Sequence, residues 1–102
     1  MSILHTVNKS PFERNSLESC LKFANQGDPV LLFEDGVYAA LKGTSAEGQL
    51  EAALAKQSLY VLGPDLAARG FAEDRMIEGI KAVDYAGFVD LAAENDKVQA
   101  WL

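Results

Sequence analysis

One unbroken apolar run organises the hydrophobic pattern of the chain. Val30-Leu31-Leu32-Phe33 follows the turn residues Gly27-Asp28-Pro29 and precedes Glu34-Asp35-Gly36. An apolar run of strand length between two turn segments is typical of a strand that is buried on both faces. Such strands lie in the middle of parallel sheets that helices cover. We therefore predict a central strand here, with Asp35-Gly36 at the carboxyl edge of the sheet, where ligands and partners of such folds bind.

The rest of the chain alternates between strand-like and helix-like segments. Short β-prone runs predict strands at residues 3–7, 58–62 and 80–83, and an edge strand at 97–101. Caps and helical periodicity predict helices over the following ranges: from Ser10 or Asn15 to Gly27, 37–41, 45–56, 65–69 and 84–95. Residues 71–78 show no clear period and are expected to form a loop or a short helix.

This order of elements, βαβαα-βα-βα-β, predicts the class of fold. Strands that alternate with helices imply right-handed crossovers and a mostly parallel sheet. We expect an α/β protein, a single small doubly wound domain over residues 1–102, whose sheet of about five strands is flanked by helices.

Composition and charge exclude several classes of function. The formal net charge is −6 and the nine Lys and Arg residues are scattered, so the chain lacks the basic surface that direct nucleic-acid binding requires. No apolar stretch approaches the roughly 18 residues of a membrane helix. Met1–His5 lacks the features of a signal peptide, and a single cysteine fits a reducing compartment. We expect a cytoplasmic protein.

Cys20 is the candidate with special chemistry. It lies in the apolar stripe of the first helix with Leu17, Leu21, Phe23 and Ala24, which favours a buried packing residue. The alternative role is a sulfur-carrying thiol, which needs exposure and a stabilised thiolate. The pattern of residues leaves both roles of Cys20 open.

The remaining polar candidates have simpler interpretations. His5, the lone histidine, is expected to be a hydrogen-bonded structural residue, and its spacing from Cys20 matches no metal site. A Cys–His nucleophile pair would lack a third supporting residue. Asp35 is expected to be a helix N-cap rather than a ligand-binding carboxylate. Because no phosphate-binding glycine motif is present, we expect no cofactor.

Short motifs along the whole chain resemble the DsrH/TusB family. They are Leu4-His5-Thr6, Ser10-Pro11, Gly27-Asp28, Leu31-Leu32, Asp35-Gly36-Val37, Ala39-Ala40, Asp65-Leu66, Ala68-Arg69-Gly70, Asp84-Tyr85, Phe88-Val89 and Ala100-Trp101. The resemblance implies a small DsrE-like α/β fold. It also implies one of three homologous subunits in a heterohexamer that passes persulfide sulfur between thiols. The implied partners are a DsrE/TusD-type subunit, a DsrF/TusC-type subunit and a DsrC/TusE-type sulfur acceptor protein.

The family has two branches, one in cytoplasmic sulfur oxidation and one in 2-thiolation of the wobble uridine of tRNA. Its principal sulfur-carrying cysteine belongs to the DsrE/TusD-type subunit, and this chain has no equivalent. A cysteine in the first helix is typical of the sulfur-oxidising branch. The resemblance is therefore closer to DsrH and implies a relay subunit in sulfur oxidation, with Cys20 as a candidate sulfur carrier. The alternatives are a TusB-type subunit for tRNA thiolation and a purely architectural subunit. In each case we expect an accessory subunit rather than an enzyme.

Overall fold

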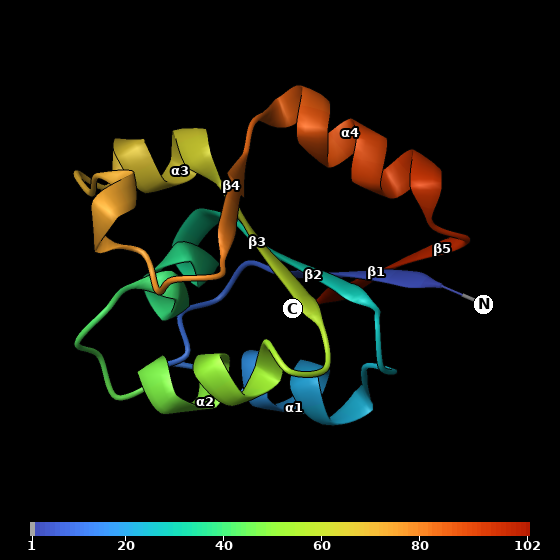
Figure 1. Cartoon of the computed structure of the whole chain (residues 1–102), viewed down its shortest axis with the longest axis horizontal. Coiled ribbons are helices and arrows are strands. Elements are labelled where there is room, and N and C mark those ends of the chain that lie inside the picture. Colours follow the sequence, from blue (N-terminus) through green and yellow to red (C-terminus); the bar gives the residue numbers. More distant parts are fainter. Residues whose placement is uncertain (1) are drawn as a thin grey trace.

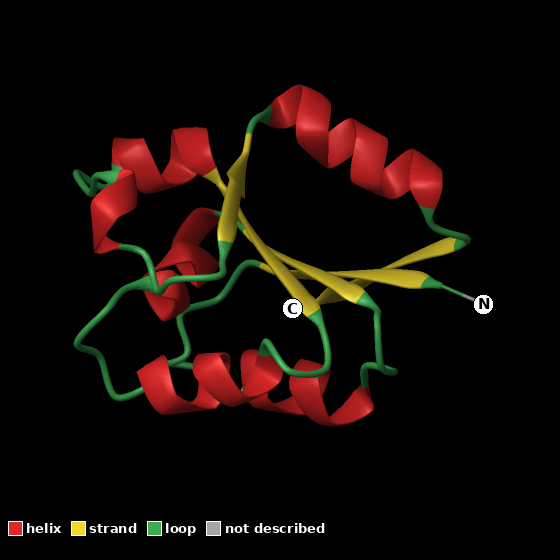
Figure 2. Cartoon of the chain, viewed as in Figure 1, coloured by secondary structure: helices red, strands yellow, loops and turns green. Residues whose placement is uncertain are grey.

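A single five-stranded parallel sheet forms the centre of the protein, with helices on both of its faces (Figures 1 and 2). The computed structural model describes residues 2–102. The strands are β1 (Ile3–Val7), β2 (Pro29–Leu32), β3 (Ser58–Leu62), β4 (Lys81–Val83) and β5 (Lys97–Trp101). Their order in the sheet is β4-β3-β2-β1-β5, and every pair of neighbours is parallel. The predicted doubly wound α/β fold is confirmed.

The connecting helices divide between the two faces of the sheet. They are α1 (Ser16–Phe23), η1 (Glu34–Ala40), α2 (Glu47–Ala53), α3 (Gly63–Ala68), η2 (Glu73–Arg75) and α4 (Tyr85–Glu94), of which η1 and η2 are 3-10 helices. Figure 1 shows α1 and α2 beneath the sheet and α4 above it. No helix within residues 2–102 is long and apolar enough to cross a membrane.

The predicted central strand is confirmed as β2, the third of the five strands in the sheet order. All four residues from Pro29 to Leu32 are buried, because β1 and β3 pair with its two edges and helices cover its two faces. A continuous apolar run satisfies this environment, since alternate side chains enter the cores on opposite faces.

The two cores differ greatly in size. On the α1/α2 face, Val30, Leu32 and Val61 belong to a large buried cluster that also includes residues of α1, α2, α3 and η1. On the α4 face, the buried cluster consists of Leu4, Leu31 and Leu91 alone among the described residues. The α4 side of the sheet is therefore thinly covered.

Two helix ends differ from the sequence prediction. The first helix begins at the later of its two predicted starts, directly after Asn15. Ser10 lies in a separate turn, where its Oγ accepts a hydrogen bond from Phe12 N. The predicted end at Gly27 is wrong: α1 ends at Phe23 and Ala24 is already extended. The cause is a side chain, since Asp28 Oδ2 accepts a hydrogen bond from Asn25 N at 3.0 Å and turns the chain toward β2.

The segment after β2 also departs from the prediction. We predicted an α-helix from Val37 with Asp35 as its N-cap, whereas the chain forms η1 from Glu34. Asp35 does not cap it, because its carboxylate accepts from the Arg69 guanidinium at 2.9 Å. The backbone N–H of Glu34 instead donates to Asp65 Oδ2 at 2.7 Å. Contacts with the next βα unit therefore outweigh the local capping preference.

Candidate functional site

Cys20 lies in the large core between α1 and the sheet. Its side chain has no exposed surface and belongs to the buried cluster that contains Leu17 and Val30. Burial, together with the nearby negative charge of Asp28, raises the pKa of the Cys20 thiol to about 12. A thiol must ionise to act as a nucleophile, so we expect Cys20 to pack in the core and to react slowly in this conformation.

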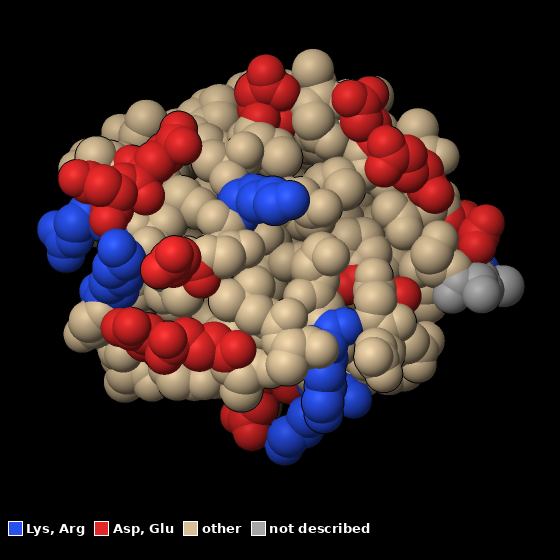
Figure 3. Space-filling view, in the orientation of Figure 1, with Lys and Arg blue, Asp and Glu red and all other residues tan. Residues whose placement is uncertain are grey.

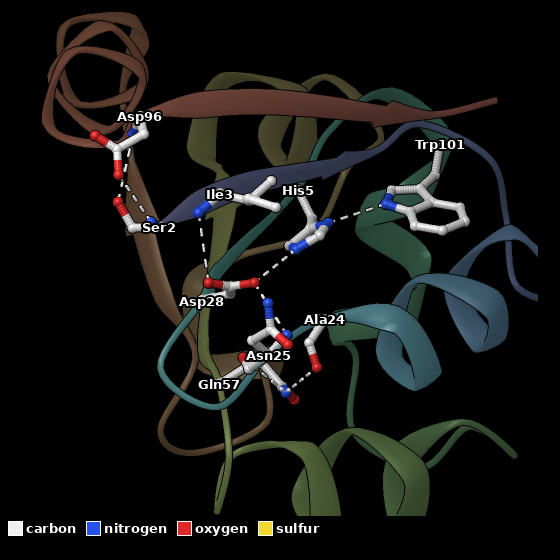
Figure 4. A network of polar contacts seen from close by, with 9 residues as sticks. All are labelled: Ser2, Ile3, His5, Ala24, Asn25, Asp28, Gln57, Asp96 and Trp101. Carbon is white, nitrogen blue, oxygen red and sulfur yellow. Dashed lines mark hydrogen bonds and ion pairs between the residues drawn. The ribbon is translucent and has the colours of Figure 1, made fainter.

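His5 and Asp28 form a buried polar pair beside this core. His5 Nε2 lies 2.9 Å from Asp28 Oδ2, and the side chains are 0% and 4% exposed. His5 belongs to β1, whereas Asp28 lies in the turn before β2, as Figure 4 shows. The parallel register, with His5 opposite Val30, brings the pair together.

Trp101 completes the network on the other side of the imidazole ring. Its Nε1 donates a hydrogen bond to His5 Nδ1 at 3.1 Å (Figure 4). An indole N–H can only donate, so Nδ1 must be the unprotonated nitrogen and Nε2 must carry the proton that is donated to Asp28. The two partners thus fix the tautomer of His5 that carries its proton on Nε2.

Asp28 joins three segments of the chain through its two carboxylate oxygens. Besides the bond from His5, it accepts hydrogen bonds from Asn25 N at 3.0 Å and Ile3 N at 3.4 Å. Burial by itself would raise the pKa of Asp28, but the hydrogen bonds from His5, Asn25 and Ile3 outweigh it and hold that pKa below its usual value. Asp28 is therefore an ionised structural anchor for the start of β1 and β2.

This network has the composition of a catalytic dyad but not the geometry of one. Both ring nitrogens of His5 already have partners, so neither is available to take a proton from Cys20. Within residues 2–102, no group of three or more His, Cys, Asp or Glu side chains could hold a metal ion. The arrangement orders the protein and offers no acid–base chemistry of its own.

The carboxyl edge of the sheet, where we expected ligands or partners to bind, holds an ion pair instead of a ready-made ligand site. Arg69 contacts Asp35 through Nε at 3.1 Å and through its terminal nitrogen at 2.9 Å. The hydrogen bond from this guanidinium to Asp35 raises the pKa of Arg69. Asp35 and Arg69 thus neutralise one another and link η1 to the end of α3.

An open hollow of about 580 Å³ lies at the carboxyl ends of β3 and β4. Its lining includes Gly63, Pro64, Ala82 and Gly87, together with the acidic residues Glu73 and Asp84. Asp84 caps α4, since its Oδ1 accepts from Gly87 N at 2.8 Å, as the sequence predicted. The lining carries two carboxylates and no cation, so the hollow is unsuited to anionic ligands.

Sequence reasoning missed Asp28 and the role of Trp101 in this network. The available signal was the Gly27-Asp28-Pro29 turn, which places a carboxylate at the amino end of the central strand. The expectation that His5 is a hydrogen-bonded structural residue is confirmed by its two partners.

Comparison with known proteins identifies the family. The family described as DsrH like protein matches residues 9–98 of this chain. The chain belongs to the DsrH/TusB family. Protein TusB of Erwinia tasmaniensis is 43% identical over 100 residues, which is 97% of this chain and 100% of that protein. Protein TusB of Pectobacterium parmentieri is 37% identical over 99 residues, with the same coverage of the two chains.

Solved structures show the same fold at low sequence identity. The crystal structure of ychN protein from E. coli superposes with a TM-score of 0.82 at 18% identity and covers 98% of each chain. Protein MTH1491 of Methanobacterium thermoautotrophicum gives a TM-score of 0.73 at 13% identity, over 96% of this chain and 97% of that one. These likenesses confirm the predicted architecture of this DsrH/TusB family member.

Family membership was predicted correctly, but the closer likeness to DsrH is not confirmed. Relatives that match over the full chain, among them those of Erwinia tasmaniensis and Pectobacterium parmentieri, bear the name TusB. The presence of Cys20 in the first helix was the sole ground for favouring DsrH, and its burial gives that residue a packing role that either branch could use.

Proposed function

We propose that this chain is a subunit of a sulfur-relay complex that supplies sulfur for 2-thiolation of the wobble uridine of tRNA. The observation that supports this branch is its similarity to proteins named TusB, which reaches 43% identity and extends over 97% of the chain. The resemblance of the whole chain to the DsrH/TusB family supports the proposed role in sulfur relay.

The proposed complex is a cytoplasmic heterohexamer. In it the chain would assemble with DsrE/TusD-type and DsrF/TusC-type subunits, and the complex would pass persulfide sulfur to a DsrC/TusE-type acceptor. The only cysteine of this chain is Cys20, which is buried with a pKa of about 12. The sulfur chemistry would therefore reside on cysteines of the partner proteins. This assigns an accessory rather than an enzymatic role to the chain.

The role requires no direct contact with tRNA. The formal net charge is −6, and Figure 3 shows acidic side chains on several parts of one face of the molecule, with the basic ones in a few small, separate groups. Such a surface lacks the lysine and arginine clusters that displace counterions from phosphate. Sulfur would reach tRNA through the acceptor protein and a later enzyme.

Complementation tests this proposal. The chain, expressed together with its own DsrE/TusD-type and DsrF/TusC-type subunits, should restore 2-thiouridine to tRNA in an E. coli strain that lacks its own three subunits. Mass spectrometry of tRNA nucleosides measures the product. Omission of this chain from the set is the control. Equal thiolation with and without the chain would contradict the proposal.

A second candidate function is persulfide relay in sulfur oxidation, and the presence of Cys20 favours it. A cysteine in the first helix is typical of that branch, as the sequence resemblance implies. If the three subunits assemble in the E. coli strain but restore no 2-thiouridine, the sulfur-oxidation role gains support. Transfer of persulfide sulfur to a DsrC-type acceptor from the same organism would then be the direct assay.

A further inference from the structure

The outward face of α4 is apolar. We define this outer face as Tyr85, Ala86, Val89 and Ala93, all of which are exposed. Tyr85 is 60% exposed and Val89 is 65% exposed, and both are large hydrophobic side chains. At 100° per residue these four positions fall on one side of the helix, opposite the buried Leu91.

The inward face of α4 is apolar as well. Leu91 is buried, and Phe88 and Ala92 pack against the small cluster formed with Leu4 and Leu31. A surface helix of a soluble protein normally carries polar residues on its outer side, whereas a helix that is apolar all round is normally buried. The apolar positions of α4 lie on both its inward and its outer face, with Asp90 and Glu94 between them on one side, which is the pattern of a helix that has protein on two sides.

The thin core beneath α4 supports the same conclusion. Tyr60, Val83 and Phe88 remain only partly buried on this face of the sheet. Val98 pairs with Leu4 in register, so both side chains point to the α4 face, yet Val98 is 51% exposed. A surface docked on α4 would extend a core that the chain by itself leaves incomplete.

The charges around α4 indicate what kind of surface docks there. Four acidic residues and no Lys or Arg occur between positions 84 and 96: Asp84, Asp90, Glu94 and Asp96. Asp90 and Glu94, one turn apart, flank the outer face on one side. Figure 3 shows acidic side chains over the region of the molecule that contains α4. A second copy of this chain would bring like charges together, since each copy also has a net charge of −6.

We propose that the outer face of α4 is the docking surface for one of the two homologous subunits. That subunit would contact α4 through an apolar helical face of its own that is rimmed by Lys or Arg. This inference rests on the proposed relay complex and adds the surface and the chemistry of the contact. Apolar burial of Val89 and Tyr85 would supply most of the attraction, and the pairing of basic side chains with Asp90 and Glu94 would select the partner and its orientation.

Two variants test the proposal with the full chain. Val89→Asp places a carboxylate in the outer face, with Ala52→Asp on the exposed side of α2 as its control. D90K/E94K reverses the acidic flank and raises the net charge from −6 to −2. Its control is E51K/E78K, which causes the same change in charge at two exposed positions away from α4. All substituted side chains are exposed, so melting by circular dichroism should stay close to that of the unaltered chain.

The measurement is binding of each variant to the purified DsrE/TusD-type and DsrF/TusC-type subunits from the same organism. We expect Val89→Asp and D90K/E94K to weaken assembly by about tenfold or more, whereas both control variants should assemble normally. Assembly of the unaltered chain should weaken as salt rises, and D90K/E94K should lose that salt dependence.

Other outcomes overturn the inference in distinguishable ways. If the unaltered chain assembles and the α4 variants assemble equally well, the docking surface is wrong and the proposed complex stands. If only the binding of the DsrC/TusE-type acceptor is lost, the partner is wrong. If α4 mediates self-association that Val89→Asp abolishes, a second copy occupies the face. If the unaltered chain does not assemble with either subunit, both the inference and the proposed heterohexamer fail.

Discussion

Trp101 and His5 are joined by a hydrogen bond of 3.1 Å from the indole Nε1 to the imidazole Nδ1, across a separation of 96 residues in the chain. The bond attaches the edge strand β5 to β1, and Phe23 of α1 packs edge-on against the indole at 5.6 Å between ring centroids. The single tryptophan and the single histidine of the protein therefore hold the last strand in place.

Trp101→Phe should destabilise the protein by about 1–3 kcal/mol, because it leaves the buried His5 Nδ1 without a hydrogen-bond donor. Unfolding in urea, followed by circular dichroism, measures the loss. Tyr85→Phe is the matched control, since it alters an exposed aromatic side chain on α4 and should change stability by less than about 0.5 kcal/mol. Equal effects of the two substitutions would show that the bond to His5 contributes little.

Asp28→Asn should make the protein less stable at pH 7, by about 1–3 kcal/mol, because it removes a buried hydrogen-bonded carboxylate. The pKa of Asp28 is lowered by folding, so its stabilising contribution is present above the unfolded pKa of 3.8 and disappears as the pH falls through the folded value. The difference in unfolding free energy between the unaltered protein and Asp28→Asn should therefore shrink as the pH is lowered below 3.8.

Urea titrations at several pH values measure this difference. Glu13→Gln, which alters an exposed carboxyl group outside the network, is the control and should have little effect at any pH. A difference between the unaltered protein and Asp28→Asn that grows on acidification would contradict the lowered pKa.

Cys20 should react slowly with a thiol reagent in the folded protein and rapidly after denaturation, because the thiol is buried and its pKa is about 12. Glu18→Cys in a Cys20→Ala background supplies an exposed thiol on the same helix and should react rapidly when folded. Cys20→Ser should cost roughly 1–3 kcal/mol, since it buries a hydroxyl group in the core.

A persulfide donor extends the test of Cys20. The folded chain, alone or assembled, should gain no sulfur atom on the Cys20 peptide by mass spectrometry while the cysteine of the DsrE/TusD-type subunit is loaded. Loading of Cys20 in the assembled complex would give it the sulfur-carrier role and would require α1 to move away from the sheet.

Gly36→Ala should destabilise the protein by about 1–3 kcal/mol. The chain crosses the end of β1 here, where Phe33 N donates to the Val7 carbonyl at 3.1 Å. An added Cβ at Gly36 would overlap that carbonyl oxygen. Gly48→Ala is the control: it lies in α2 with nothing within 4 Å of an added Cβ, so it should stabilise the protein by up to about 1 kcal/mol. Thermal or urea unfolding measures both changes.

The isolated chain should show no useful affinity for tRNA. With a net charge of −6 it has no counterion-release contribution, and filter binding near physiological salt should give nothing tighter than roughly 10⁻⁴ M. Micromolar binding that weakens with salt would contradict this expectation and would assign a nucleic-acid surface to the chain.

The sequence by itself determined the fold class, the central strand and the capped start of α4. The apolar run from Val30 to Phe33 was long enough only for a strand, and the turn residues at both of its ends predicted a strand in the middle of a parallel sheet. Asp84 capped α4 as predicted, because a capping carboxylate acts within three residues of its own position. Each of these signals lies within a short segment of the sequence and does not depend on contacts with distant residues.

The tertiary structure decided the roles of Asp28, Asp35, Cys20 and His5. Asp35 does not cap η1, because its carboxylate pairs with Arg69, which is 34 residues away. α1 ends early because Asp28 turns the chain toward β2. The apolar stripe of α1 favoured a buried Cys20, with an exposed thiol as the alternative. Contact of that stripe with the sheet buries the residue. His5 received its partners from 23 and 96 residues away. Such partners depend on which strands become neighbours in the sheet, and strand order is fixed by the packing of the whole chain rather than by any short segment of it.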